Sequence, residues 1–175
     1  MDEATMSRRD EDACCGRKLD PKEILVADAG LDRDEVAILT LTRFYFQSFA
    51  VPQTHAWIGA LEHTQAHFGE AHGLLVAGRV LGAIKVMRST RRSVFCFNSP
   101  TCPGCAAILT EHERRMIRSL AALRCGRDGL ARTELMMLCE GNDTDDVLAA
   151  FRVLAQALPY VANRAEGANV YHSVH

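Results

Sequence analysis

Apolar side chains recur every three to four residues in several stretches of this chain, a spacing typical of amphipathic α-helices. The clearest stretch covers residues 32–50, where one side of a helix would carry Ile38, Leu41, Tyr45 and Phe49. Similar stretches, separated by prolines or glycines, cover residues 54–69, 111–124, 130–140 and 144–158. Because the alternating pattern of β-strands is almost absent, we predict an all-α fold, a helical bundle of about five to six helices with a cysteine-containing loop.

The chain has 175 residues, enough to bury a core without disulfides or metal ions. We expect residues 31–159 to form one helical domain, preceded by a mobile polar arm at 1–30 and followed by a loose tail at 160–175. Within the arm, residues 24–29 are apolar enough to form a short helix or a docking strand.

Residues 70–87 are apolar but are interrupted by Gly73, Gly78 and Gly82. Each glycine costs a helix about 1 kcal/mol relative to alanine, so either the helix tolerates them or it breaks near Gly73. Gly78 and Gly82 lie one helical turn apart, and that spacing allows the backbone of a neighbouring helix to come close.

The longest stretch without helical periodicity is residues 89–110, which contains three cysteines, two prolines and a glycine. Loops of that length inside a domain are usually functional or disordered. Thr110 and Glu113 have the spacing of a capping box, so we expect a helix to begin there.

The cysteines of this loop predict a metal site. Cys102 and Cys105 flank a Pro-Gly turn, which lets two thiolates reach one ion, and Cys96 supplies a third. His112, in the first turn of the next helix, is the favoured fourth ligand of a zinc ion. Two alternatives stay open: an iron–sulfur cluster on the same cysteines, or thiols that bind no metal and pack as small apolar groups.

The other cysteines have simpler interpretations. Cys125 and Cys139 lie in apolar helical surroundings and are expected to fill the core, whereas Cys14 and Cys15 lie side by side in the polar arm. No secretion signal or apolar run of membrane-spanning length is visible, so we predict a cytoplasmic protein with no membrane contact.

The chain has a formal net charge of −2, but ten bases face only three acids between residues 85 and 132. This basic block surrounds the cysteines and is a candidate surface for DNA or a protein partner, with these residues: Arg88, Arg91, Arg92, Arg114, Arg115 and Arg118. The alternative is a set of solvated helix faces, which is favoured because the bases are not interleaved with aromatic residues.

The last three helices leave open a helix-turn-helix arrangement in the C-terminal half. The final helix begins with Asp143, Asp145 and Asp146, which would repel phosphate, so it is a poor candidate for reading DNA.

A second group of candidate ligands lies on the helix expected at residues 54–69. His63, His67 and Glu70 follow one another at helical spacing and are expected to face water or a partner, away from an apolar stripe formed by Trp57, Leu61, Thr64 and Phe68. Two histidines one turn apart can bind zinc, although the glutamate that follows the first histidine in zinc proteases is replaced here by Thr64.

These features predict a small cytosolic metal-binding regulatory protein that acts by binding DNA or a protein partner. The alternatives are a metalloenzyme that uses His63, His67 and Glu70, and a helical interaction module without metal. Phosphate-binding loops and nucleophile elbows are absent from the sequence, so a named enzymatic reaction is not indicated, and the oligomeric state is not indicated either.

Overall fold

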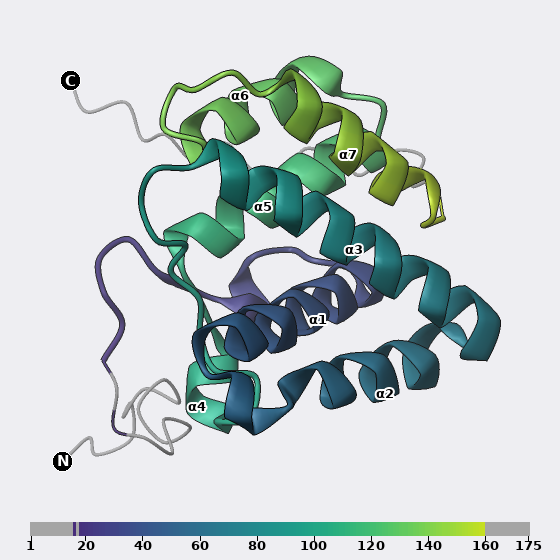
Figure 1. Ribbon diagram of the computed structural model, residues 1–175. Helices are drawn as coiled ribbons and strands as arrows, with labels where there is room; N and C mark the ends of the chain where they lie inside the picture. The colour runs from purple at the N-terminus through teal and green to yellow at the C-terminus, as the bar shows by residue number, and fades with distance from the viewer. Residues whose placement is uncertain (1–15, 17, 160–175) are drawn as a thin grey trace, which may run out of the picture.

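The computed structural model describes Gly16 and residues 18–159, which form seven α-helices and one two-stranded sheet (Figure 1). The helices are α1 (Arg33–Ala50), α2 (Ala56–Phe68), α3 (Glu70–Thr90), α4 (Pro103–Ala106), α5 (Glu111–Arg124), α6 (Asp128–Leu138) and α7 (Asp145–Gln156). The strands are β1 (Ile24–Leu25) and β2 (Ile108–Leu109), and short 3₁₀ helices cover Val26–Asp28 and Pro52–Thr54. The predicted all-α bundle is confirmed, with α4 as an extra short helix in the cysteine loop. None of the helices within the described ranges is long and apolar enough to cross a membrane.

Helix α1 lies inside the bundle, in contact with α2, α3 and α5, while α7 packs against α3 and α5 and α6 packs against α5 (Figure 1). One apolar core runs through these contacts. Its largest fully buried side chains include Leu41, Met87, Ile117 and Leu148, one from each of four helices. Cys139 is also fully buried in this core, as predicted, and Cys125 is partly buried.

Helix α2 buries only part of its predicted apolar stripe. Thr64 of the stripe is fully buried and Leu61 and Phe68 are partly buried, but Trp57 is 48% exposed, and Ala60, outside the stripe, is fully buried. The reason is the close approach of α3, because a Cβ on Gly73 would lie only 2.8 Å from the carbonyl oxygen of Thr64. Only small groups fit along this contact, so the large indole lies outside it.

The break between α2 and α3 lies at Gly69, whose φ of +81° is unfavourable for residues with a Cβ. Helix α3 then continues through Gly73, Gly78 and Gly82 to Thr90. The glycines at residues 70–87 are therefore tolerated within one helix.

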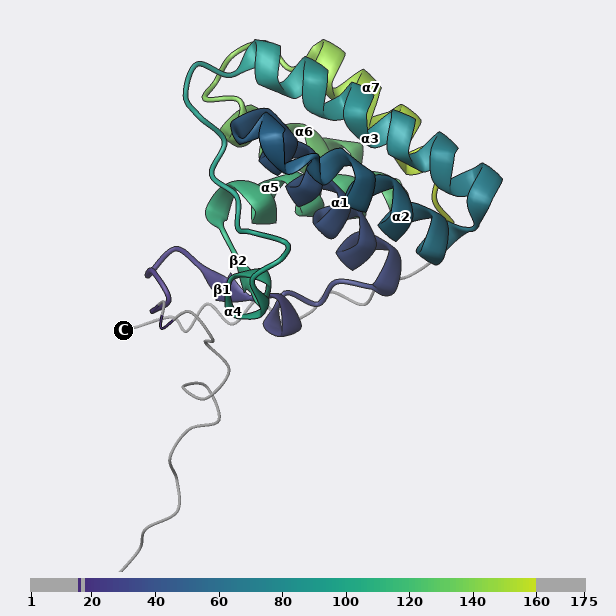
Figure 2. The same ribbon diagram turned by 60° about the horizontal axis from the view of Figure 1, so that its bottom comes forward.

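Part of the predicted arm is held against the domain. Ile24 pairs with Leu109 and Leu25 with Ile108 in an antiparallel ladder, and the Val26 amide donates to the Ala107 carbonyl at 2.8 Å. Figure 2 shows this β1–β2 pair beside α4, below the main helices. The docking strand expected in residues 24–29 is thus present, while Cys14, Cys15 and the predicted tail at 160–175 lie outside the described residues.

Helices α1 and α5 run antiparallel and are joined at both ends by buried arginines. At one end, Arg43 of α1 binds Glu113 in the first turn of α5 (the loop junction). At the other end, Arg124 of α5 binds Asp32, Asp34 and Glu35 at the start of α1 (the terminal junction). In each junction the glutamate is also the N3 residue of a capping box, Asp32–Glu35 for α1 and Thr110–Glu113 for α5.

Candidate functional site

A surface cavity with a volume of about 320 Å³ lies between the C-terminal ends of α1 and α3 and the segment 91–97. We name it the Arg–Phe pocket. Its lining combines aromatic and cationic side chains: Phe46, Phe49, Ala50, Arg88, Arg91, Arg92, Ser93, Val94, Phe95 and Phe97.

The aromatic part of the pocket is a group of packed rings. Phe46 and Phe95 are stacked with ring centroids 4.3 Å apart, and Phe97 also stacks on Phe46, with ring centroids 5.5 Å apart. Phe49 meets Phe46 edge to face at 6.2 Å and is 39% exposed. The rings therefore give the pocket a rigid apolar wall with one ring partly open to solvent.

The cationic part has one buried and two exposed arginines. Arg88 lies over the Phe49 ring, 4.3 Å from its centroid, and Arg92 is exposed. The side chain of Arg91 is only 2% exposed, and its guanidinium lies 5.8 Å from the Phe95 centroid. Neither Arg88 nor Arg92 forms an ion pair with any residue in the range 18–159.

Arg91 is held in place from the α6 end of the molecule. It donates to the Leu138 carbonyl and to the Ser93 hydroxyl, and it lies 3.3 Å from Glu140. The Nε of Arg91 is buried and has no hydrogen-bond partner among the described residues.

Glu140 fixes the start of the same segment. Its carboxylate accepts hydrogen bonds from the amides of Arg92 and Ser93, at 3.0 Å and 3.2 Å, and from the Ser93 hydroxyl. The hydrogen bond from that hydroxyl, followed by the one from the Arg92 amide, lowers the pKa of Glu140. The pocket wall at residues 91–93 is therefore tied to the turn after α6.

The pocket corrects the expectation that the basic residues lack aromatic neighbours. Phe46 and Phe49 come from α1, some forty residues before Arg88, so linear interleaving could not reveal them. The segment itself carried a signal, since Arg91 and Arg92 are followed within five residues by Phe95 and Phe97.

The rest of the predicted basic surface is largely neutralised. Arg115 pairs with Glu111 at 2.7 Å and with Glu134 at 3.4 Å, and Arg118 pairs with Glu134 at 3.2 Å. Arg114 is partly buried, with an Nε that has no hydrogen-bond partner among the described residues. The structure therefore groups Arg88, Arg91 and Arg92 in one pocket and leaves the three arginines of α5 outside it.

The helices that could form a helix-turn-helix also pair their charges with one another. Arg132 of α6 lies 2.6 Å from Asp145, and Arg152 of α7 lies 2.5 Å from Asp128. DNA reading by these helices stays a prediction.

The predicted zinc ligands lie around the loop junction. His112 accepts a hydrogen bond at Nδ1 from the Cys96 amide at 2.9 Å, and its Nε2 lies 3.5 Å from the Arg91 guanidinium. Cys102 and Cys105 are partly buried at α4, and Cys96 is exposed. Burial, followed by the charge of Arg91, lowers the pKa of His112.

Among the described residues, no three or more histidine, cysteine, aspartate or glutamate side chains are grouped so that they could hold a metal ion. The zinc site at Cys96, Cys102, Cys105 and His112, and the alternative iron–sulfur cluster, stay predictions.

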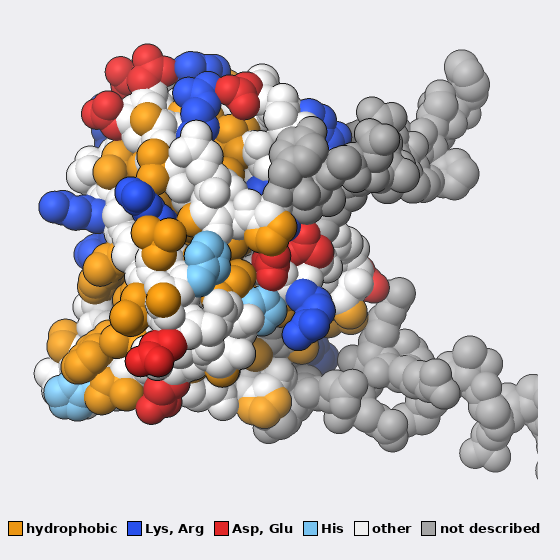
Figure 3. Space-filling view, turned by 90° about the vertical axis from the view of Figure 1, so that its right-hand side faces the viewer, with side chains coloured by type: hydrophobic (Ala, Val, Ile, Leu, Met, Phe, Trp, Pro, Cys, Tyr) orange, Lys and Arg blue, Asp and Glu red, His pale blue; other side chains and the backbone are white. Residues whose placement is uncertain are grey.

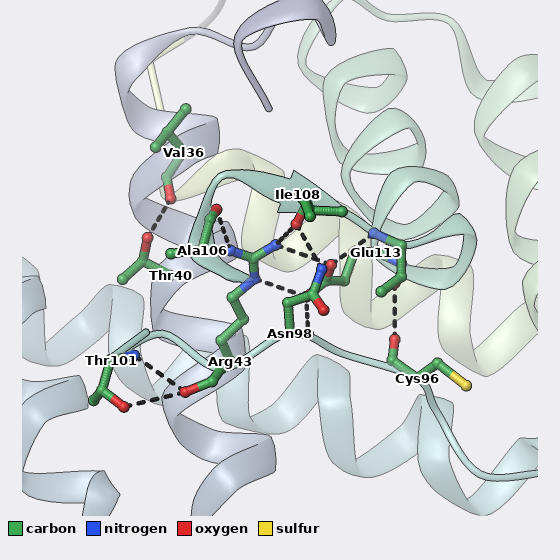
Figure 4. Close-up of polar contacts among 11 residues, drawn as sticks. Val36, Thr40, Arg43, Cys96, Asn98, Thr101, Ala106, Ile108 and Glu113 are labelled. Carbon is green, nitrogen blue, oxygen red and sulfur yellow. Dashed lines mark hydrogen bonds and ion pairs between the residues drawn. The ribbon is translucent and has the colours of Figure 1, made fainter. Parts of the chain in front are cut away.

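An ion pair anchors the loop. The Arg43 guanidinium donates to both Glu113 carboxylate oxygens and to the carbonyls of Ala106 and Ile108 (Figure 4). Glu113 also accepts the Asn98 amide at 3.0 Å, while the Cys96 sulfur points away from Arg43 (Figure 4).

The expectation that the histidines of α2 face water or a partner is wrong, whereas a metalloenzyme role of His63, His67 and Glu70 stays a prediction. His67 pairs with Asp34 of α1 at 2.9 Å, and His63 packs toward Phe44 of α1, so both rings face the neighbouring helix and not the solvent. Burial lowers the pKa of His63; a backbone hydrogen bond at Ala37 opposes this effect in part, and the charge of His67 adds a smaller lowering. Glu70 lies beyond the break at Gly69 on α3, so it does not share their helix.

Comparisons of the chain with protein-family models, curated proteins and solved structures found no match.

Proposed function

We propose that this protein binds a small organic anion with a flat apolar body in the Arg–Phe pocket. The observation that carries the proposal is the lining of the pocket, in which buried Arg91 and the exposed Arg88 and Arg92 lie beside stacked phenylalanines.

The two parts of the pocket fit the two parts of such a ligand. A flat apolar body would lie against the exposed ring of Phe49 and the Phe46–Phe95 stack. A carboxylate, sulfonate or phosphate would lie toward Arg88 and Arg92, whose side chains are exposed at the rim. A volume of about 320 Å³ is at the lower end of the range for small-molecule sites.

This proposal keeps the prediction that the protein acts by binding, and it narrows the binding surface from six arginines to three. Regulation by the bound anion is a natural role for such a protein, because the pocket is tied through Arg91 and Glu140 to the end of α6.

The test uses 2-naphthoate as the probe, with 2-naphthamide supplying the same rings without charge and sulfate supplying charge without rings. We expect calorimetric titration of the full chain to show binding of naphthoate, and weaker binding of either control compound. Replacing Arg92 with alanine should weaken naphthoate binding about tenfold, the loss of one charge-assisted contact.

The matched control is Arg79→Ala, which removes an exposed arginine of α3 that does not line the pocket. The proposal is overturned if naphthoate does not bind, if the amide binds equally well, or if Arg79→Ala has the same effect as Arg92→Ala. Tight, salt-sensitive binding of an oligonucleotide that depends on Arg114 and Arg118 would instead support the predicted nucleic-acid surface.

A further inference from the structure

A second surface of the molecule lies on the outer side of α3, opposite the side that packs in the core. Leu74, Leu75 and Leu81 are 49%, 46% and 40% exposed there. Figure 3, which looks at the hairpin end of α2 and α3, shows hydrophobic side chains gathered near charged ones at one edge of this side. We name the surface the Leu–Gly face and define it by eight residues of α3: Glu70, Ala71, Leu74, Leu75, Gly78, Leu81, Gly82 and Lys85.

These residues form a continuous stripe. With ~100° per residue, they fall within an arc of about 140° along the helix. The core-facing residues of α3, such as Val76, Val80 and Ala83, lie on the other side and are almost completely buried. Helix α3 is thus apolar on two sides, and only one of them has a partner among the described residues.

The two glycines leave the face without side chains at positions 78 and 82. A Cβ built on Gly78 or on Gly82 would meet nothing within 4 Å among the described residues. In contrast, Gly73 is needed inside the molecule, since its Cβ would collide with α2. Packing within the described domain therefore does not account for Gly78 and Gly82, although each lowers helix stability by about 1 kcal/mol relative to alanine.

We propose that the Leu–Gly face binds the same face of a second copy of this chain, with the two α3 helices antiparallel and crossing at Gly78. A two-fold axis through Gly78 places Leu74 of each copy opposite Gly82 of the other, so that a large side chain enters the space left by a missing one. The leucines at positions 75 and 81 then lie opposite one another.

The charges at the ends of the stripe favour a second copy in this orientation. Glu70 and Lys85 are both exposed and lie at nearly equal distances from Gly78, eight residues before it and seven after it. The antiparallel pairing brings Glu70 of each copy next to Lys85 of the other, whereas a parallel pairing would bring like charges together. The face is therefore complementary to itself in shape and in charge.

The decisive variant is Gly82→Leu, measured on the full chain by analytical ultracentrifugation over a dilution series. The added side chain has free space in the single copy but fills the site of the incoming leucine, so the dimer dissociation constant should rise by about tenfold or more. The melting temperature extrapolated to low concentration should not fall, because removing a helical glycine favours the helix. Gly129→Leu is the matched control, a helical glycine of α6 with equally free space.

Charge reversal tests the orientation. Glu70→Lys and Lys85→Glu should each weaken the dimer, and mixing the two single variants should restore it, because both ion pairs of the mixed dimer are then complementary. The proposal is overturned if the wild-type chain stays monomeric up to its solubility limit, if Gly82→Leu and Gly129→Leu dimerise equally well, or if the mixture is no stronger than either variant alone.

Discussion

The loop junction and the terminal junction use the same parts in different surroundings. In each, a buried arginine of one helix binds the glutamate of the other helix's capping box and also reaches a backbone carbonyl. At the loop junction the side chains of both partners are shielded from solvent, since Arg43 is 2% exposed and Glu113 is 0% exposed. At the terminal junction Arg124 and Glu35 are equally buried, but Asp32 is 32% exposed.

This difference in exposure shows in which junction the carboxylates could still reach water if the arginine were removed. Glu113 accepts four hydrogen bonds, two from Arg43 and one each from the amides of Asn98 and Thr110, so its charge has no access to water. Arg124 shares its charge among three carboxylates, and two of these, Asp32 and Asp34, are already 32% and 25% exposed to solvent. The loop junction is therefore expected to be the more sensitive, because an unpaired buried charge is far more costly than an exposed one.

The largest effect is expected for Arg43→Met, which leaves Glu113 charged and buried. The free energy of unfolding should fall by about 3–5 kcal/mol, measured by urea denaturation. Amide exchange at Asn98 and Thr110 should accelerate more than exchange at Glu35, whose amide belongs to the other junction. Arg79→Met, at an exposed position, is the control, and a loss for Arg43→Met below about 1 kcal/mol would contradict this account.

A smaller effect is expected for Arg124→Met at the terminal junction. Glu35 loses one buried partner, but Asp32 and Asp34 regain water, so the loss should be about 2–3 kcal/mol. The same variant frees the Pro159 carbonyl, which accepts from Arg124 at 3.2 Å. If Arg124→Met destabilises the protein more than Arg43→Met, exposure of the acidic partners does not explain the difference between the junctions.

Local signals were enough to predict most of the fold. The helix at residues 32–50 and the capping box at Thr110 and Glu113 are both present, because caps and periodicity depend on residues a few positions apart. The apolar stripe of α2 is right for Thr64 and wrong for Trp57, because the buried side of this helix is decided by the contact between Gly73 and Thr64. That contact joins two helices, so the apolar pattern of neither helix taken alone could predict it.

The candidate site was predictable only in part, for a similar reason. Arg88, Arg91 and Arg92 were expected at a binding surface, but their aromatic neighbours on α1 are distant in sequence. The cysteine loop was expected to need a metal staple, while the pairing of Glu113 with Arg43, seventy residues away, has no local pattern. The zinc prediction remains to be tested by the zinc content of the purified chain and by its loss in Cys102→Ser.

The smallest expected effect is on the pH dependence of the free energy of unfolding. One contributing histidine lies at each end of the α1–α5 pair. His112 adjoins the loop junction, and its pKa is lowered by burial and by Arg91 against opposing effects of Glu111 and Glu140. The unfolded chain therefore takes up this proton first as the pH falls, so the stability that His112 contributes is complete above about pH 6.5 and is lost below it. The pKa of His63, whose neighbour His67 binds Asp34 of the terminal junction, is lowered too and acts in the same direction.

The variant His112→Asn separates the two contributions, because its side-chain oxygen can still accept the Cys96 amide but cannot be protonated in this range. The free energy of unfolding of His112→Asn should decline less steeply between pH 6.5 and pH 5 than that of the wild type, measured by urea denaturation across this range. Near pH 8 the imidazole is neutral in both the folded and the unfolded state, so the difference in free energy of unfolding between the two proteins should no longer change with pH. The remaining slope in His112→Asn should fall further in the double variant with His63→Asn. An unchanged slope in His112→Asn would mean that acid acts on the terminal end of the helix pair and not on the loop junction.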